Sequence, residues 1–600
     1  MKLIYGGARE EQPNQVVRWI ARAAATLLVL IGGTLTVHNT PARVAVIGFA
    51  TILIWRFSAA SSFADFLKQR PLLLVALAVT AFLVAGRGLM LLGAELHHNS
   101  VVTIAIGAVL SVAVLVALLA AARQLAGRLS RARGDAAYDG PTVCLGTTTG
   151  LLARNGHARG ARRGVKIELR AREIGQSILV LGETGAAKTS AAITPIVKQL
   201  LASNASFLFI DGKGDMAGPI ARLAARLNRV VKHIGIGALR INLLRGFTPQ
   251  QGAKIVVEAL RLSGQTGSDS AFWISNATNL VENALSILST TPRYYNLYHL
   301  YRFTFNEAFR KERLAEATEH LIDYQARVDG GDSSADAPKR SLRMACEYFS
   351  DVYATMNEKT RNDINATIGT VLQPFQNPAI LDAFCAQQDE ADLEELDSGV
   401  IFVLTLSLAE YDLVAPFVFM FVKQRYDRHV KNRASLPYDD PRRKLLTGMI
   451  MDEYQKIASA TDADSLDVIR SLGGFYVAGT QSVNALERVL GSKETTYALL
   501  QNFVQKICFG TSDVATIEYF ASVVGEVDVE RLSTSQTHGP AASSSISQSL
   551  QRMKVITGQT FRGLGQDKRN AAAVALLKIN GHAYDDVIIM PKLYAEDLEN

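Results

Sequence analysis

A glycine-rich stretch followed by a lysine and two hydroxyl residues carries the clearest chemistry in the sequence. It reads Gly182-Glu183-Thr184-Gly185-Ala186-Ala187-Lys188-Thr189-Ser190 and lies between a short apolar run and a helix-forming segment. Glycine lets a backbone turn tightly around an anion, and the start of a helix offers free N–H groups to it. The pattern predicts that this whole stretch binds ATP, with Lys188 acting catalytically on the phosphates and Thr189 ligating Mg²⁺.

One position departs from the usual phosphate-loop pattern G-x-x-x-x-G-K-[ST]. The residue before the lysine is Ala187 where the pattern has glycine. The alternative interpretation is an ordinary glycine-rich turn. The order strand, glycine loop and helix favours the nucleotide loop.

An acidic pair follows a second apolar run. Thr447–Met451 reads as a buried strand, and Asp452 and Glu453 come directly after it. In a P-loop ATPase such a pair holds Mg²⁺ and polarises the attacking water, so we expect Asp452 to be a metal ligand and Glu453 to be catalytic. The structural alternative is a helix that begins with two acids. The glycine loop upstream favours the catalytic interpretation.

Three more polar residues lie next to predicted strands. Asp211 follows the predicted strand Ser206–Ile210. Arg470 comes before the predicted strand Phe475–Thr480, and Gln481 comes directly after it. We expect Asp211 to bind the cofactor and Gln481 to sense the γ-phosphate. Each residue also has a structural interpretation on the pattern alone: a turn aspartate, a solvated strand-end glutamine and a solvated arginine in the last turn of a helix.

Strand and helix signals divide the rest of the chain. Apolar strands that alternate with helical segments predict an α/β nucleotide-binding domain over residues 134–255 and 396–600. Helical spacing without strands predicts an all-α domain, residues 256–395, inserted in it. The Ser/Thr-rich tract Leu532–Gln548 is predicted to be a mobile loop.

The beginning of the chain reads as a membrane domain, residues 1–125. Four apolar runs approach the ~20 residues that span a bilayer; they are Trp19–Val37, Val44–Trp55, Leu72–Leu92 and Val101–Ala122. Lysine and arginine cluster before the first run, between the second and third, and after the fourth. The positive-inside rule then predicts four spans with both termini in the cytoplasm. A buried helical domain is the alternative.

Charge and cysteine content add weak constraints. The formal net charge is +7, which is compatible with an anionic partner without requiring one. The four cysteines are far apart and form no C-x-x-C pair, so neither a zinc site nor a disulfide framework is indicated.

Taken together, the motifs resemble those of type IV secretion and conjugation coupling proteins (TraG/TraD-like), which belong to the FtsK/HerA group of ring ATPases. The resemblance runs from about residue 140 to 590 and rests on six segments in the same order: GETGAAKTS, DGKGD at 211–215, Trp273 in AFWISNATNLVENAL, MIMDEYQ, VAGTQSVNAL and KICFGTSDVATIEYF. This sequence departs from the family in Ala187 and in its four predicted spans, where coupling proteins usually have two.

The resemblance implies a RecA-like P-loop ATPase that pumps DNA during conjugation. Its partners would be DNA, relaxase and relaxosome proteins, the channel components of the type IV secretion system and the membrane. It would be a multi-pass protein of the bacterial inner membrane with its ATPase domain in the cytoplasm. It would assemble as a homo-hexamer in which Arg470 acts catalytically on the neighbouring subunit's site. Two alternatives stay open, namely a receptor or adaptor that recruits protein substrates for type IV secretion, and an FtsK-like DNA translocase.

Overall fold

The computed structural model describes residues 140–150, 152, 163–203, 205–262, 270–537, 543–567, 572–579 and 585–591. The chain divides into two compact units, Met1–Tyr138 and Asp139–Asn600, and everything described lies in the second. The four predicted membrane spans lie outside the described residues. Among the helices that are described, none combines the length and the apolar character that crossing a bilayer requires.

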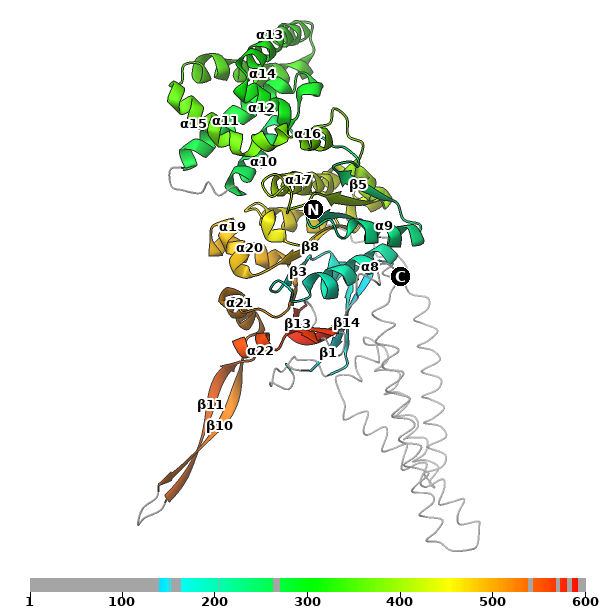
Figure 1. Ribbon diagram of the computed structural model, residues 1–600, viewed down its shortest axis with the longest axis vertical. Coiled ribbons are helices and arrows are strands. Elements are labelled where there is room, and N and C mark those ends of the chain that lie inside the picture. Colours follow the sequence, from blue (N-terminus) through cyan, green and yellow to red (C-terminus); the bar gives the residue numbers. More distant parts are fainter. Residues whose placement is uncertain are drawn as a thin grey trace, which may run out of the picture. The chain divides into compact units, whose positions relative to one another are not determined.

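The centre of the described unit is a mixed sheet dominated by parallel strands (Figure 1). Seven neighbouring strands are parallel and follow the order β9-β3-β8-β7-β4-β6-β5. Their bounds are β3 (Ile178–Leu181), β4 (Ser206–Asp211), β5 (Val231–Gly235), β6 (Ile401–Thr405), β7 (Thr447–Met451), β8 (Gly474–Thr480) and β9 (Gln505–Cys508). Strand β7 has the bounds that its apolar run predicts.

Antiparallel strands extend the sheet beyond β9, in the order β13, β14, β1 and β2. They comprise β1 (Thr142–Thr148), β2 (Lys166–Arg170), β13 (Ala572–Lys578) and β14 (Asp585–Pro591), and the short β12 (Gly565–Asp567) pairs with β13. Strands from the beginning and from the end of this unit therefore lie together in the part of the sheet beyond β9.

Alternating side chains of the parallel strands fill two separate cores. In β3, Ile178 and Val180 belong to one buried cluster, while Leu179 and Leu181 belong to the other. Successive residues of a strand point to opposite faces, so a strand with apolar residues at every position must be covered on both sides. This explains why the predicted strands read as continuous apolar runs rather than as alternating patterns.

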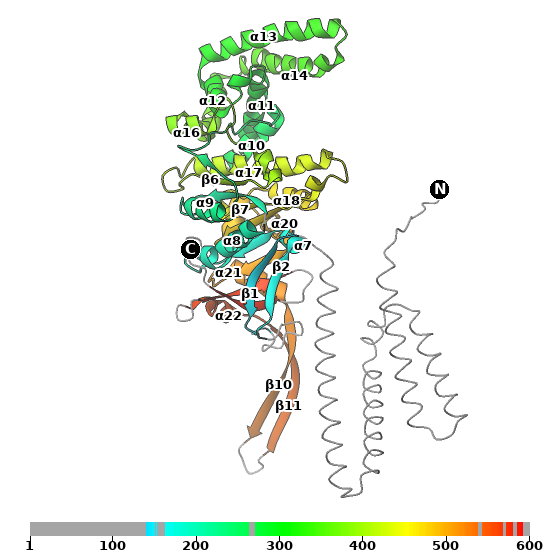
Figure 2. The same cartoon turned by 90° about the vertical axis from the view of Figure 1, so that its right-hand side faces the viewer.

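Helices cover both faces of the sheet (Figure 2). A π-helical turn, Thr189–Ile193, leads into α8 (Thr194–Ala202), which packs with α9 (Ala217–Arg226) in the first core. The second core contains α17 (Ala415–Asn432), α18 (Asp462–Ser471) and α20 (Lys493–Asn502). Shorter helices complete the fold: α7 (Ala171–Ile174), α19 (Val483–Leu490), α21 (Val514–Val524) and α22 (Gly558–Arg562).

A helical segment lies between β5 and β6 in the chain. Its helices are α10 (Pro249–Leu262), α11 (Ser270–Leu288), α12 (Leu297–Phe305), α13 (Glu307–Asp329), α14 (Asp336–Glu347), α15 (Glu358–Leu372) and α16 (Pro378–Phe384). The first of them begins at Pro249, before the predicted boundary at residue 256. Helix α17 lies between these helices and the sheet, where α10 contacts it (Figures 1 and 2).

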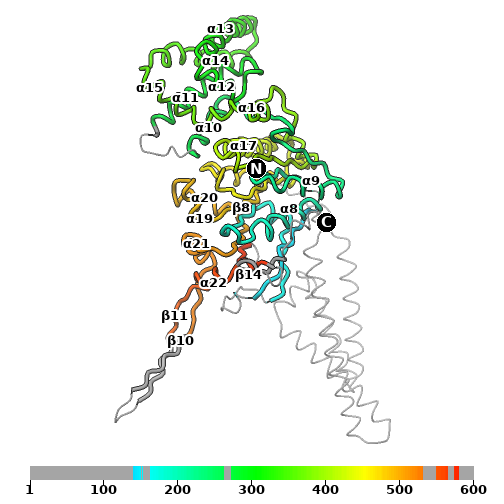
Figure 3. The backbone as a smooth tube through the Cα atoms, in the orientation of Figure 1, coloured from blue at the N-terminus to red at the C-terminus, as the bar shows by residue number. Residues whose placement is uncertain are grey.

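The prediction of a mobile loop at Leu532–Gln548 is wrong. Strands β10 (Glu526–Thr537) and β11 (Ser543–Lys554) form a separate two-stranded antiparallel sheet that follows α21 and leads to α22 (Figure 3). The pairing is continuous from Glu526–Lys554 to Thr537–Ser543. Serine and threonine content suggested a loop, but the cross-strand hydrogen bonds of a hairpin satisfy the backbone whatever the side chains are.

A fully buried ion pair fixes α17 against the segment that follows β7. The ammonium of Lys423 lies 2.6 Å from Oδ1 of Asp462, and both side chains have no exposed surface. The ammonium also donates to the Ile457 carbonyl oxygen at 2.7 Å, and the second carboxylate oxygen of Asp462 accepts from the Tyr454 hydroxyl. Each charge is paired and hydrogen-bonded, which is the condition under which buried ions are tolerated.

We expect Lys423→Met to lower the free energy of unfolding by about 3–5 kcal/mol, because the Asp462 carboxylate is left buried without a counter-ion. The double variant Lys423→Met/Asp462→Asn is expected to recover part of this loss. Denaturant unfolding followed by circular dichroism measures both. Lys311→Met, which removes an exposed pair with Glu307, is the control; a loss no larger than that of the control contradicts the prediction.

Candidate functional site

The register of the parallel strands brings the predicted motifs to one edge of the sheet. Leu181 pairs with Thr480, and Met451 pairs with both Ala478 and Ile210. The glycine loop, the acidic pair, Gln481 and the DGKGD segment follow these positions directly. Because the strands are parallel, all four segments leave the sheet at the carboxyl edge, where α/β proteins place their ligands.

The glycine loop turns back on itself through left-handed backbone positions. Gly182 has φ 153°, Gly185 has φ 81° and Ala187 has φ 74°. At Gly182 an added Cβ would lie 2.9 Å from Cβ of Phe509, so this position has no room for a side chain. Ala187 adopts a conformation that costs an L-residue about 1–2 kcal/mol relative to the right-handed region. The loop therefore keeps the phosphate-loop shape although alanine replaces glycine.

Lys188 lies against the loop that precedes it. Its ammonium donates to the carbonyl oxygen of Gly182 at 2.7 Å and to that of Glu183 at 3.1 Å. Burial lowers the pKa of Lys188, an effect that the nearby Asp452 and Glu453 carboxylates oppose. The side chain is thus held at the mouth of the loop.

A small cavity of about 220 Å³ lies between the glycine loop and the acidic pair. Residues from both motifs line it, together with a lysine of the DGKGD segment; they are Thr184, Gly185, Ala187, Lys188, Thr189, Ser190, Lys213, Asp452 and Glu453. Gly182, Glu183 and Ala186 belong to the loop without lining the cavity. The Glu183 carboxylate accepts hydrogen bonds from the side chain and backbone of Ser512, which lower its pKa.

Thr189 and Asp452 meet at the floor of this site. The hydroxyl of Thr189 donates to Oδ2 of Asp452 at 2.5 Å, joining residues 263 positions apart. A threonine hydroxyl and a carboxylate are hard oxygen ligands of the kind that Mg²⁺ takes from proteins, with waters and phosphates completing its shell. The donor set present here therefore fits this metal.

Glu453 is held in a strained and defined position. Its backbone is left-handed, with φ 66° and ψ 41°. Its Oε2 accepts a hydrogen bond from the Gln481 side-chain amide at 3.0 Å and another from the amide of Gln455. Non-glycine residues in this region of backbone space concentrate at functional sites, because the surrounding structure must enforce them. The structure thus connects Gln481 and Gln455 to the acidic pair, while the sensing of the γ-phosphate by Gln481 stays a prediction.

Lys213 is the residue lining this cavity that the sequence analysis did not select. Its ammonium lies 2.9 Å from Oδ2 of Asp452 and 3.9 Å from Oε1 of Glu453. Partial burial opposes protonation, but the carboxylates of Asp452, Glu453 and Asp215 together outweigh it, so the pKa of Lys213 is raised. The available signal was a lysine two positions after Asp211, at the end of a strand that neighbours β7.

Neither Asp211 nor Arg470 lines the cavity of its own chain. The buried Asp211 carboxylate accepts hydrogen bonds from the backbone N–H groups of Lys213, Gly214, Met216 and Ala217, and it does not line the cavity. These hydrogen bonds shape the loop that follows β4, and the cofactor-binding role of Asp211 stays a prediction. Arg470 is exposed at the end of α18, which leads into the amino end of β8, so it lies at the opposite edge of the sheet from the cavity.

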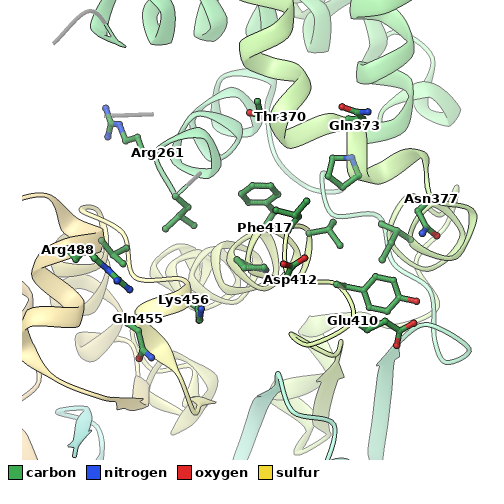
Figure 4. A pocket seen from close by; sticks show the side chains of 18 of the residues that line it. Arg261, Thr370, Gln373, Asn377, Glu410, Asp412, Phe417, Gln455, Lys456 and Arg488 are labelled. Atoms are coloured by element: carbon green, nitrogen blue, oxygen red, sulfur yellow. The ribbon is translucent and has the colours of Figure 1, made fainter. Parts of the chain in front are cut away.

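A second, larger cavity of about 1150 Å³ lies beside Gln481 (Figure 4). Its walls come from α10, α15 and α16 of the helical segment and from residues 410–417, Gln455, Lys456 and α19. Figure 4 shows the cations Arg261, Lys456 and Arg488 toward one side and Glu410 toward the other. Gln455 and Gln481, the two residues whose amides bind Glu453, line this cavity as well. A continuous set of contacts therefore joins the two cavities.

The left-handed backbone at Ala187 leads to a stability prediction. We expect Ala187→Gly to raise the free energy of unfolding by about 0.5–1 kcal/mol, because glycine adopts positive φ without steric cost. Ala221→Gly, in the middle of α9, is the matched control and is expected to lower stability by about 1 kcal/mol. Denaturant unfolding of both variants measures the contrast, and equal losses in the two contradict the assignment of strain to Ala187.

Comparison with known proteins gives one family match and a set of distant structural likenesses. Residues 447–566 match the family model described as the TraM recognition site of TraD and TraG. No curated protein matches the chain. Among solved structures, the unbound conjugative coupling protein TrwBΔN70 is 16% identical, with a TM-score of 0.48 over 70% of this chain and 85% of that one. VirB4 of Thermoanaerobacter pseudethanolicus is 11% identical, with a TM-score of 0.41 over 76% and 98%.

The family match covers β7, the acidic pair, Gln481 and the β10–β11 hairpin, which are features of the site and of its surroundings. It confirms, over residues 447–566, the resemblance to TraG- and TraD-type coupling proteins that the sequence motifs predict.

Proposed function

We propose that the chain is an ATP hydrolase that moves DNA through a type IV secretion channel during conjugation. The observation that carries the hydrolase is the convergence of Lys188, Thr189, Asp452 and Glu453 on one cavity, with Gln481 bonded to Glu453. These groups come from three strand ends, and each matches a part that P-loop ATPases require. The match of residues 447–566 to the TraM recognition site of TraD and TraG supports the choice of substrate pathway.

The chemistry follows from the positions of the side chains. The loop N–H groups and Lys188 would bind the phosphates of ATP, and Thr189 and Asp452 would hold Mg²⁺, which would supply charge neutralisation for the transferred phosphoryl group. Glu453 orients and polarises the attacking water. The amides of Gln455 and Gln481 set the direction of the Glu453 carboxylate, so a movement of either glutamine changes the rate of hydrolysis.

The position of Arg470 supports a ring in which each site is completed by a neighbour. This exposed arginine lies at the sheet edge opposite its own cavity, where a second subunit of a hexamer can present its cavity to it. The predicted spans in residues 1–125 would anchor the ring in the inner membrane, with the described unit in the cytoplasm.

The larger cavity favours a second candidate function, a receptor for protein substrates of the same channel. Cations on one side and the carboxylates of Glu410 and Asp412 elsewhere in its lining suit a peptide that carries both signs of charge. A nucleic acid is uniformly anionic, so those carboxylates repel it. ATPase assays of the full chain with and without DNA separate the two: strong stimulation by DNA supports the motor, and indifference to DNA supports the receptor.

Lys188→Ala is expected to abolish ATP turnover while leaving the fold intact, because the phosphates keep only backbone donors. Phosphate release by the purified full chain measures turnover, and circular dichroism checks the fold. Lys254→Ala, which removes an exposed lysine of α10, is the control. Hydrolysis by Lys188→Ala at the rate of the unaltered protein would sink the assignment of the loop.

Arg470→Ala is expected to stop hydrolysis without preventing ATP binding, because an arginine supplied across a subunit interface contributes on the order of 10³-fold or more to the rate. Mixing it with inactive Glu453→Gln subunits should restore part of the activity, since some interfaces then contain one complete set of groups. Phosphate release across a series of mixing ratios measures the recovery. Mixed rings without any recovery would show that Arg470 does not complete a neighbour's site.

A further inference from the structure

The loop that carries Lys213 is built to place it beside the acidic pair. The Asp211 carboxylate accepts from the backbone N–H of Lys213 at 3.3 Å and from that of Gly214 at 2.8 Å, and Gly214 makes the turn at φ 77°. Strand β4, which ends at this loop, is hydrogen-bonded to β7, which ends directly before Asp452. Backbone structure alone therefore brings position 213 next to position 452.

A single oxygen atom of Asp452 serves both Thr189 and Lys213. Oδ2 accepts from the Thr189 hydroxyl at 2.5 Å and from the Lys213 ammonium at 2.9 Å. The Asp452 side chain is 11% exposed, whereas that of Lys213 is 49% exposed. The carboxylate is thus nearly enclosed, while the lysine is a flexible chain that solvent reaches.

A Mg²⁺ ion next to Thr189 would draw on this same carboxylate. A cation held there, directly or through a water, requires the lone pairs of Oδ2 that the ammonium occupies. The ammonium and a metal ion at the same carboxylate also repel each other. Lys213 and the metal therefore compete for Asp452.

We propose that the Lys213 ammonium is a displaceable counter-ion of Asp452, which leaves this carboxylate when Mg²⁺ binds with the nucleotide. The proposal rests on the proposed ATPase site and adds a residue to it. Before the metal arrives, Lys213 screens Asp452 and Glu453 from the phosphates, so that nucleotide approaches the two carboxylates without full repulsion. Displacing the lysine then uses part of the free energy with which the metal binds. This cost determines how strongly the affinity for nucleotide depends on Mg²⁺.

The proposal predicts opposite effects of one substitution in two conditions. In Lys213→Met, nucleotide should bind more weakly without metal, because two carboxylates face the phosphates uncompensated. With Mg²⁺ the variant no longer has to displace a lysine, so binding should be maintained or tightened. The ratio of the dissociation constant in EDTA to that in Mg²⁺ should rise roughly tenfold, the scale of one charge-assisted hydrogen bond.

The experiment titrates the full chain in detergent with a fluorescent ADP analogue, in EDTA and in Mg²⁺. Lys213→Arg keeps the charge and should keep a ratio near that of the unaltered protein. Lys232→Met is the matched control, since it removes a lysine whose ammonium lies 2.6 Å from Oε1 of Glu395, and neither residue of this pair lines the cavity.

Each other outcome counts against the proposal. A ratio that stays unchanged in Lys213→Met, including equal weakening in both conditions, shows that Lys213 only supports the loop. A ratio that falls shows that the lysine assists the metal-bound nucleotide instead of competing with the metal. If the unaltered protein binds nucleotide neither in EDTA nor in Mg²⁺, the proposed ATPase is overturned as well. This result is therefore distinct from a failure of the inference alone.

Discussion

Hydrogen bonding between adjacent parallel strands is the constraint on which the nucleotide cavity depends. The residues that line it, with the two glutamines that bind Glu453, come from four segments up to several hundred positions apart, and they meet because β3, β8, β7 and β4 end level with one another. A shift of one residue in any of these strands would exchange the side chains that it places in the two cores. It would also move one catalytic segment away from the others. The two cores that clamp the sheet from both sides therefore set the geometry of the chemistry.

Within that frame, the site is governed by how few acceptors serve many donors. Oδ2 of Asp452 takes the hydroxyl of Thr189 and the ammonium of Lys213, and Oε2 of Glu453 takes the amides of Gln455 and Gln481. Each carboxylate is thus linked to a different neighbour, the first to the loop after β4 and the second to the wall of the larger cavity. A movement of the loop after β4, or of the wall of the larger cavity, therefore reaches the acidic pair through one hydrogen bond.

Local patterns predicted the central strands and the phosphate loop because both depend on short-range features. Continuous apolar runs mark strands that are covered on both faces, and the loop needs only its own glycines and the helix after it. Sequence failed where the outcome depends on partners far along the chain. The hairpin of β10 and β11 depends on cross-strand pairing rather than on composition, and Lys213 and Gln455 acquire their contacts only after β4, β7 and the following turn have assembled. Asp211 is a further case, since its four backbone hydrogen bonds, which shape the turn after β4, could not be read from the motif.

The buried pair of Lys423 and Asp462 has a consequence for how this fold can change over generations. With both side chains enclosed, replacing either residue alone strands a charge in the interior, and the two codons lie too far apart to change together in a single event. Drift therefore cannot pass easily from this pair to an apolar one, even where the apolar pair would be as stable. The ion pair joins α17 to the helix that carries Arg470 and to the turn after Glu453. We expect this contact to change slowly, because a chain with only one of the two substitutions is less stable. Related chains are expected to vary around this contact while keeping it.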